Sequence, residues 1–348
     1  MATKLGFGFL RAVGTLFGLV AVTFLLLRLA PGDPALLRFS SGEDAVNAAA
    51  IEALARFRAE HLLDRSLLVQ FAHYVGPFDL GPTGHVWFGG SGARPWHGLL
   101  AGELGTEYLR PSVSIAQELG ARLSVTVPLA LGSAFLVFAL GIPLGIAQAL
   151  RRGSLFDGWT RAITLALYSA PVFWLALLAQ EAFGPAGLDW LPILGLRSRG
   201  ADAGSPADLA AHAVLPLLCM SCGGIAFLSR QVRSAVLETS RSEFVRAARA
   251  RGLPERSVIL RHVLRNSLAP AITLAGQVLP WLVGGSLLVE TVFELPGMGK
   301  YAFDSLQRRE YDAVAACVLV SGVLTLAGLV CSDLLQARFD PRVRDGGR

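Results

Sequence analysis

One strongly basic stretch of this 348-residue chain, Glu243–Pro270, lies between two long apolar runs. Three arginines, Arg246, Arg249 and Arg251, follow one another closely within it. Guanidinium groups bind carboxylates well because each presents several N–H donors in a fixed, planar arrangement. The stretch therefore suggests recognition of an acidic surface on a partner. The alternative is an ordinary basic loop exposed to solvent.

The apolar spacing in this stretch predicts two short helices separated at Gly252–Leu253. Ser242 can cap the first helix, because its hydroxyl can accept an otherwise unpaired backbone N–H, and Glu243 suits the positive end of that helix. Gly252 is a typical helix stop, and Pro254 tolerates the missing N–H at the start of the next helix. The stretch is therefore expected to be structured.

The first of these helices carries small residues beside its charges. Helical spacing places Phe244, Ala247, Ala248 and Arg251 on one face, with the remaining arginines on another. Alanine side chains allow the backbone of a partner to come close. We expect this face to be a docking surface.

Residues typical of catalysis and metal binding do not form recognisable sites in the sequence. No phosphate-binding Gly-x-x-x-x-Gly-Lys-Ser/Thr motif, His-Glu-x-x-His motif or Gly-x-Ser-x-Gly motif occurs. Cys219 and Cys222 have the spacing of a metal or redox pair, but a second such pair and a suitable histidine are lacking, so buried thiols are the preferred interpretation. His262 lies in the basic stretch, where a solvated role is expected. The chain is expected to be neither an ATPase nor another enzyme.

Carboxylates inside apolar segments are costly and are often functional. Glu181 and Asp333 are the candidates, and both lie near the ends of such segments. We consider Glu181 a candidate residue of a translocation pathway. A proton-driven carrier would more typically place carboxylates in the middle of a span, where none is found.

The overall composition indicates a membrane protein. The chain is 53% hydrophobic and 16% charged, with a mean hydropathy of +0.52 and a formal charge of +5. The basic residues occur in blocks between apolar runs, which is typical of cytoplasmic loops and argues against nucleic-acid binding.

Hydropathy predicts an all-α integral membrane fold with six transmembrane helices. A large outer segment separates the first helix from the second, and the basic loop separates the fourth from the fifth. The first apolar run resembles a secretory signal in length, but no small-x-small cleavage site follows it. The expected spans are Leu5–Leu29, Leu123–Leu150, Ala162–Gln180, Ala213–Ser229, Ala271–Val289 and Ala313–Ser332.

These spans divide the chain into a first helix at 1–30, an outer segment at 31–120, a five-helix core at 121–335 that contains the basic loop at 241–270, and a tail at 336–348. Short loops on the side of the chain ends carry most of the arginines, which predicts that both termini and the basic loop are cytoplasmic. The outer segment is expected to be periplasmic. It either covers the outer ends of the spans or is a protective extracellular cap. Residues 76–96 within it are rich in Gly, Pro and aromatic residues, which predicts an irregular loop.

Several motifs together resemble one protein family. The chain is similar to permease subunits of bacterial ATP-binding-cassette importers, in the dipeptide/oligopeptide (peptide/nickel) branch. Its basic loop resembles the family's EAA loop, with Arg246-Ala247-Ala248 followed by Gly252, although Arg246 replaces the usual glutamate. The 76–96 loop is an insertion relative to the family pattern. The other motifs are LLRLAPGDPA (Leu26–Ala35), GIPLGIAQALRRGS, WLPILGL (Trp190–Leu196), ETVFELPGMGKYAF (Glu290–Phe303) and the tail LQARFDPRVR.

The resemblance implies a non-catalytic subunit in the bacterial inner membrane that works with partners. These are a second homologous permease, ATPase subunits that carry ATP and Mg, and a substrate-binding protein; no cofactor is implied in this chain. The EAA loop would dock on the ATPase. The residues it implies for docking are Glu243, Arg246, Ala247, Ala248, Arg249, Arg251 and Gly252.

The alternatives are a stand-alone proton-coupled carrier, a membrane-embedded enzyme and a membrane scaffold. The missing catalytic motifs and mid-span carboxylates argue against the first two, and a scaffold has no need for the Ala-Ala-x-x-x-Gly pattern. The substrate is open among dipeptides, oligopeptides, glutathione, nickel chelates and sugars.

Overall fold

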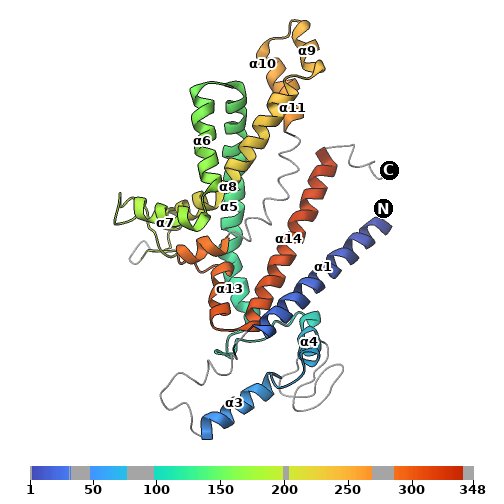
Figure 1. Cartoon of the computed structure of the whole chain (residues 1–348), viewed down its shortest axis with the longest axis vertical. Helices are drawn as coiled ribbons and strands as arrows, with labels where there is room; N and C mark the ends of the chain where they lie inside the picture. Colours follow the sequence, from blue (N-terminus) through green and yellow to red (C-terminus); the bar gives the residue numbers. More distant parts are fainter. Residues whose placement is uncertain are drawn as a thin grey trace. The chain divides into compact units, whose positions relative to one another are not determined.

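The computed structural model of the protein describes residues 2–30, 32, 48–76, 98–198, 204–268 and 286–339. Within these ranges the regular elements are helices, and the only β pairing is an isolated bridge between Thr106 and Ser114. The chain forms two compact units, described separately below: unit 1 is Met1–Leu123 with Tyr301–Val323, and unit 2 is Ser124–Lys300 with Leu324–Arg348. The all-α expectation is confirmed for the described residues (Figure 1).

Four described helices are long and apolar enough to cross a membrane. They are α1 (Ala2–Leu29), α5 (Ile115–Leu150), α8 (Pro206–Thr239) and α14 (Tyr311–Phe339). An α-helix satisfies its backbone hydrogen bonds internally, as the hydrocarbon region requires. These helices contain the first, second, fourth and sixth expected spans. The fifth expected span, Ala271–Val289, lies largely outside the described residues, so the count of six stays a prediction.

The expected third span, Ala162–Gln180, is not one continuous helix but falls on a bent pair of helices, which has the length and hydropathy of a membrane span only when the two are taken together. The chain instead forms α6 (Leu155–Ser169) and α7 (Val172–Phe183), which meet at an angle of 110°. Pro171 explains the break, because proline lacks an N–H and disfavours helical backbone in the residue before it. Ala170 is accordingly extended, with φ −78° and ψ 135°.

Unit 1 packs short helices of the outer segment around the end of α1. The described part of the outer segment contains the helices α3 (Ala48–Glu60) and α4 (Leu67–Val75). A short 3-10 turn, η1 (Leu99–Ala101), contacts α4. Residues 77–97, most of the predicted irregular loop, lie outside the described residues. The shared apolar core of the unit includes Val20, Phe24, Leu27, Phe57, Tyr74, Tyr108, Tyr311, Val314 and Ala315.

A buried carboxylate joins the outer segment of unit 1 to the start of α14. Glu310 accepts the backbone N–H groups of Tyr108 and Leu109, at 2.5 and 2.7 Å. Burial raises the pKa of Glu310 above its ordinary value. The two N–H donors satisfy a group that would otherwise be costly to bury.

Unit 2 is organised around α8, which contacts α6, α7 and α11. Its close approach to α5 is made at Gly145, where an added Cβ would lie 2.5 Å from the Ser229 carbonyl oxygen and 2.9 Å from Val232 Cβ. Small residues allow membrane helices to approach this closely. The helix α13 (Met298–Gln307) begins in unit 2, where Glu290 accepts hydrogen bonds from the Thr126 hydroxyl, at 2.7 Å, and the Lys300 N–H, at 3.0 Å.

The contact at Gly145 generates a prediction that can be tested with the same substitution at two positions of α5. Gly145→Ala is expected to lower the free energy of unfolding by about 1–3 kcal/mol, because the added methyl group overpacks the α5–α8 contact. Gly120→Ala, where a Cβ meets nothing within 4 Å, should be neutral or stabilising by up to about 1 kcal/mol. Thermal unfolding of purified protein in detergent measures both. Equal effects of the two variants would contradict the close contact.

Candidate coupling site

The basic loop follows α8 directly and is helical through most of its length (Figure 1). It comprises α9 (Glu243–Ala250), α10 (Glu255–Ser257), the π-helix η2 (Val258–Val263) and α11 (Leu264–Ser267). Gly252 has φ +76°, a left-handed conformation that favours glycine, so it ends the first helix as expected. The predicted second helix is present, with a π-helical turn in its middle.

The inner face of this loop is part of the core of unit 2. Val245, Ala248, Val258 and Val263 are each 5% exposed or less. They belong to one cluster with Val137 and Ala149 of α5 and with Leu228, Val232 and Val236 of α8. The loop is thereby fixed to the ends of two long apolar helices. The sequence analysis did not identify these valines as buried. Their spacing, on the side of the helices opposite the arginines, is a signal that could have found them.

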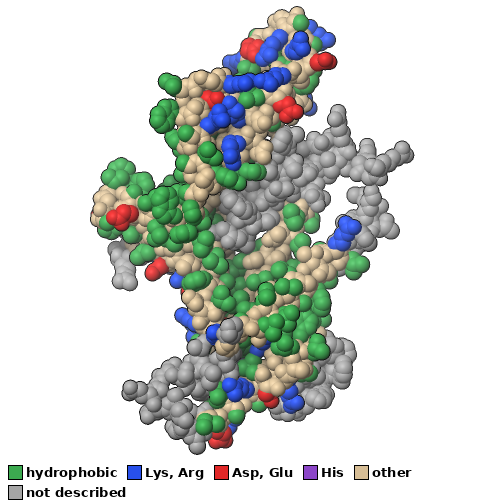
Figure 2. Space-filling model, viewed as in Figure 1, with side chains coloured by type: hydrophobic (Ala, Val, Ile, Leu, Met, Phe, Trp, Pro, Cys, Tyr) green, Lys and Arg blue, Asp and Glu red, His purple; other side chains and the backbone are tan. Residues whose placement is uncertain are grey.

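The outer face of α9 is exposed and mixes apolar with basic groups. Phe244 is 46% exposed and Leu253 is 40% exposed, and Ala247 and Arg251 are exposed between them. Figure 2 shows Lys and Arg side chains gathered over this end of the unit. Aromatic residues and arginine are enriched at protein–protein interfaces, so this surface has the composition of an interface.

Two expectations about α9 are corrected. Ala248 does not lie on the exposed face with Ala247: it is buried in the chain's own core, because α9 turns that side towards α8 and η2. The Ser242 hydroxyl does not cap α9. It donates instead to the carbonyl oxygen of Thr239, at 2.6 Å, since the preceding α8 ends only three residues earlier and leaves that oxygen within reach.

Arg249 forms an ion pair within the loop. Its Nη2 and Nε donate to the Glu255 carboxylate at 2.6 and 3.1 Å, across the turn at Gly252. The hydrogen bonds from Arg249 lower the pKa of Glu255, and those to Glu255 raise the pKa of Arg249. Sequence reasoning assigned Arg249 to an external partner and missed Glu255. Arg246 and Arg251 are exposed and form no ion pair within the described part of the chain.

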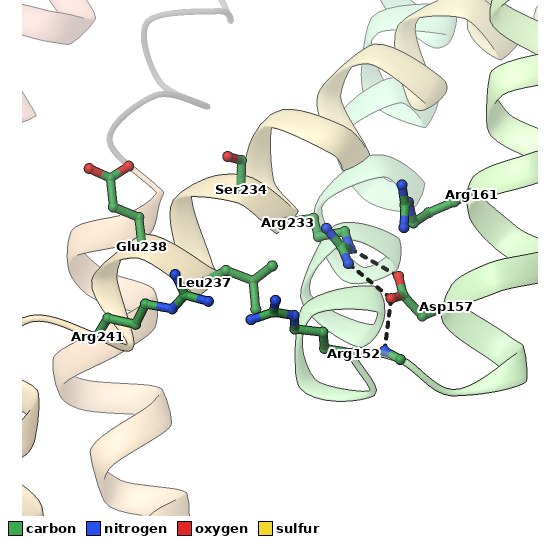
Figure 3. A pocket seen from close by; sticks show the side chains of 9 residues that line it. Arg152, Asp157, Arg161, Arg233, Ser234, Leu237, Glu238 and Arg241 are labelled. Atoms are coloured by element: carbon green, nitrogen blue, oxygen red, sulfur yellow. Dashed lines mark hydrogen bonds and ion pairs between the residues drawn. The ribbon is translucent and has the colours of Figure 1, made fainter.

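A second ion pair fixes α6 to α8 near the loop. Arg233 donates through Nε and Nη2 to the two carboxylate oxygens of Asp157, both at 2.9 Å (Figure 3). The Asp157 side chain is 3% exposed and also accepts the Gly153 N–H at 3.1 Å. Ser154 caps α6 by accepting the Asp157 N–H at 3.3 Å. Bidentate pairing of this kind orients both side chains.

The remaining sequence candidates lie apart from this loop. Glu181 is an exposed residue of α7, and its assignment to a pathway stays a prediction. Cys219 is buried and Cys222 half-buried, both as free thiols. Among the residues described, no three His, Cys, Asp or Glu side chains are grouped as metal ligands.

Comparison with known proteins places these features in a family. The family described as "Binding-protein-dependent transport system inner membrane component" matches residues 141–345, a range that contains α6 to α14 and the basic loop. The match therefore covers more than half of the chain.

Two curated relatives match nearly the whole chain. The di/tripeptide transport system permease protein DppB of Pseudomonas aeruginosa is 32% identical over 350 residues, covering 95% of this chain and 96% of the relative. The dipeptide transport system permease protein DppB of Escherichia coli K12 is 29% identical over 351 residues, with the same coverage. Among solved structures, a chain of the inward facing MetNI methionine ABC transporter matches with a TM-score of 0.46 and 21% identity, covering 67% of this chain and 98% of that chain.

The Asp157–Arg233 pair predicts a measurable loss of stability. Asp157→Asn should lower the free energy of unfolding by about 2 kcal/mol, between the values for exposed and fully buried pairs, because Arg233 is 18% exposed. Glu118→Gln is the control, since its partner Arg122 lies four residues away on the same helix and the change should cost less than about 1 kcal/mol. Thermal unfolding in detergent distinguishes the two. A control as destabilised as Asp157→Asn would argue against a tertiary role.

The Arg249–Glu255 pair predicts how the loop responds to pH. The pKa of Glu255 is lowered, so the ion pair contributes its full stabilisation at pH values above 4.5, the ordinary pKa of a glutamate. This stabilisation is lost only as the pH falls through the lowered pKa of Glu255. Amide hydrogen exchange at residues 251–257, corrected for intrinsic rates, should show the same protection at pH 7 and at about pH 5 in the wild type. Glu255→Gln should exchange faster at both values, and Glu238→Gln, an exposed glutamate of α8, should not. Unchanged hydrogen exchange in Glu255→Gln would refute a stabilising role of the Arg249–Glu255 pair in this loop.

Proposed function

Because this chain belongs to the family of inner membrane components of binding-protein-dependent transport systems, we propose that it is the permease subunit of an ATP-driven peptide importer. It forms half of the translocation pathway, and a second, homologous permease forms the other half. The peptide class is supported by the names of the relatives that match this chain along nearly its whole length. Four long apolar helices, with the bent α6–α7 pair as a further candidate, make it an integral membrane protein.

The observation that carries the proposal is the two-sided α9 helix. One side is buried among residues of α5 and α8, and the other presents Phe244, Ala247 and Arg251 to the outside. A solvated loop has no need of an exposed phenylalanine beside arginines, whereas a docking helix does. The exposed side is therefore the contact surface for an ATPase subunit, with Gly252 and Leu253 continuing it.

The buried side gives this contact a mechanical consequence. Packed interiors transmit displacement because they contain few voids. Movement of α9 by an ATPase is therefore passed to α5 and α8 through Val245, Ala248 and Val258. ATP favours one state of the pathway only through contacts that differ between the states, and this loop supplies them.

Other parts of the importer are separate chains. ATP and Mg bind to the ATPase subunits, and a substrate-binding protein delivers the peptide on the opposite side of the membrane. The loop, the N-terminus and the C-terminus are cytoplasmic in this arrangement, supported by the many arginines of α9 to α11. Glu243, Arg246 and Arg251 supply polar contacts at the edge of the surface, whereas Arg249 acts mainly within the loop through Glu255.

The docking surface is tested with two substitutions at Gly252. Nothing lies within 4 Å of a Cβ added there, and its φ of +76° is one that both Asn and Asp tolerate better than most residues. Gly252→Asp adds a negative charge to a surface proposed to face carboxylates, and we expect roughly 30-fold weaker co-purification with the ATPase and loss of peptide uptake. Gly252→Asn, which has nearly the same shape without the charge, should retain most binding.

The measurement is pull-down of the candidate ATPase by tagged permease from membranes, with the second permease followed in the same sample. Loss of the ATPase in Gly252→Asp, with the second permease retained, supports the coupling role. Normal ATPase assembly and uptake in Gly252→Asp would refute docking at this position. If the chain alone carried out uptake driven by a proton gradient, its function would be that of a proton-coupled carrier and not of an importer subunit.

A further inference from the structure

We propose that the hollow between the α5–α6 turn and α8 is a binding site for the headgroup of an anionic phospholipid. The cavity has a volume of about 590 Å³ and lies wholly within unit 2. Residues of the α5–α6 turn and α6 form one wall, and residues 233–238 of α8 form the other together with Arg241, in the turn that follows α8. It is distinct from the exposed side of α9, so the proposal does not depend on the coupling role.

The lining is strongly basic. Arg152, Arg161, Arg233 and Arg241 contribute four guanidinium groups, against two carboxylates, Asp157 and Glu238. Asp157 is already held by both donors of Arg233 and by the Gly153 N–H. Figure 3 shows the Glu238 carboxylate directed away from the arginine side chains. With four guanidinium groups and two carboxylates in its lining, the hollow has an excess of positive charge.

A phosphate group fits this arrangement chemically. Guanidinium groups bind phosphate oxygens through paired N–H donors, and three of them line this hollow, from the α5–α6 turn, α6 and the turn after α8. The Asp157–Arg233 pair connects α6 to α8 at this hollow. Basic pockets between membrane helices are recognised sites for lipid headgroups.

An adjacent apolar groove favours a lipid over a soluble phosphate. This groove, of about 330 Å³, shares Gly153 with the basic cavity and is further lined by Leu155 and Trp159. Leu155 is 82% exposed and Trp159 is 69% exposed. Figure 2 shows hydrophobic side chains exposed along this side of the unit. Tryptophan is enriched where a protein crosses the membrane–water interface, so an acyl chain has a surface beside the arginines.

The test uses Trp159 as a reporter in the full-length permease in nanodiscs. Phosphatidylglycerol with brominated acyl chains, diluted in phosphatidylcholine, should quench tryptophan fluorescence more than brominated phosphatidylcholine at the same mole fraction. Trp159→Phe identifies the share of the signal that comes from this position, since the chain has six tryptophans. The excess quenching by phosphatidylglycerol measures preference for the anionic headgroup.

The variant Arg152→Gln/Arg161→Gln leaves the Asp157–Arg233 pair intact. We expect it to weaken the preference about fivefold per arginine, roughly 30-fold in total, with unchanged thermal unfolding. Arg265→Gln, an exposed arginine of α11 outside the cavity, is the matched control and should change nothing.

Four results would overturn the proposal. Equal quenching by both brominated lipids would show no headgroup preference. If Arg265→Gln lost as much lipid preference as the double variant, the preference would come from the overall positive charge of this region and not from the cavity. Removal of the excess quenching by inorganic phosphate, at constant ionic strength, would identify a soluble anion as the ligand. A double variant that keeps its lipid preference but no longer assembles with the second permease or the ATPase would identify a subunit contact.

Discussion

The close contact of α5 with α8 is the constraint on which the described part of unit 2 depends. At Gly145 the two helices leave no room for a methyl group beside the Ser229 carbonyl. In a membrane, association gains little from the hydrophobic effect between helices, so such close packing and a few polar pairs must supply it. The Asp157–Arg233 pair then joins α6 to α8. The basic loop and the arginine-lined hollow are both built on this frame.

The basic loop combines a fixed side with a free side. Its valines pack against the ends of α5 and α8, and its exposed phenylalanine and arginines face outward. A flexible loop would not transmit a displacement to the helices, because the loop itself would deform. This loop shares a packed core with the helices that it is proposed to move. The Arg249–Glu255 pair connects the two sides of the turn at Gly252, whose φ is positive.

Much of this organisation was accessible from the sequence, and the failures have identifiable causes. The four long helices, the break at Gly252 and the family followed from hydropathy, glycine and motifs. Pro171 lies in the middle of the expected third span, and the extended conformation that it imposes on Ala170 separates two helices that meet at 110°. Helical periodicity grouped Ala248 with Ala247, because a helical wheel shows which residues are neighbours and not which side is covered.

The sequence by itself determined that the chain crosses a membrane, where its charged loop lies along the chain, and which family it belongs to. These properties depend on local composition and short motifs. Only the tertiary structure decided that Ala248 is internal, that Arg249 pairs with Glu255, and that Arg233 of α8 meets Asp157 of α6, 76 residues away. Ion pairs and buried faces depend on which helices pack together and at what rotation. That choice arises from steric fit at positions such as Gly145, which no local pattern records.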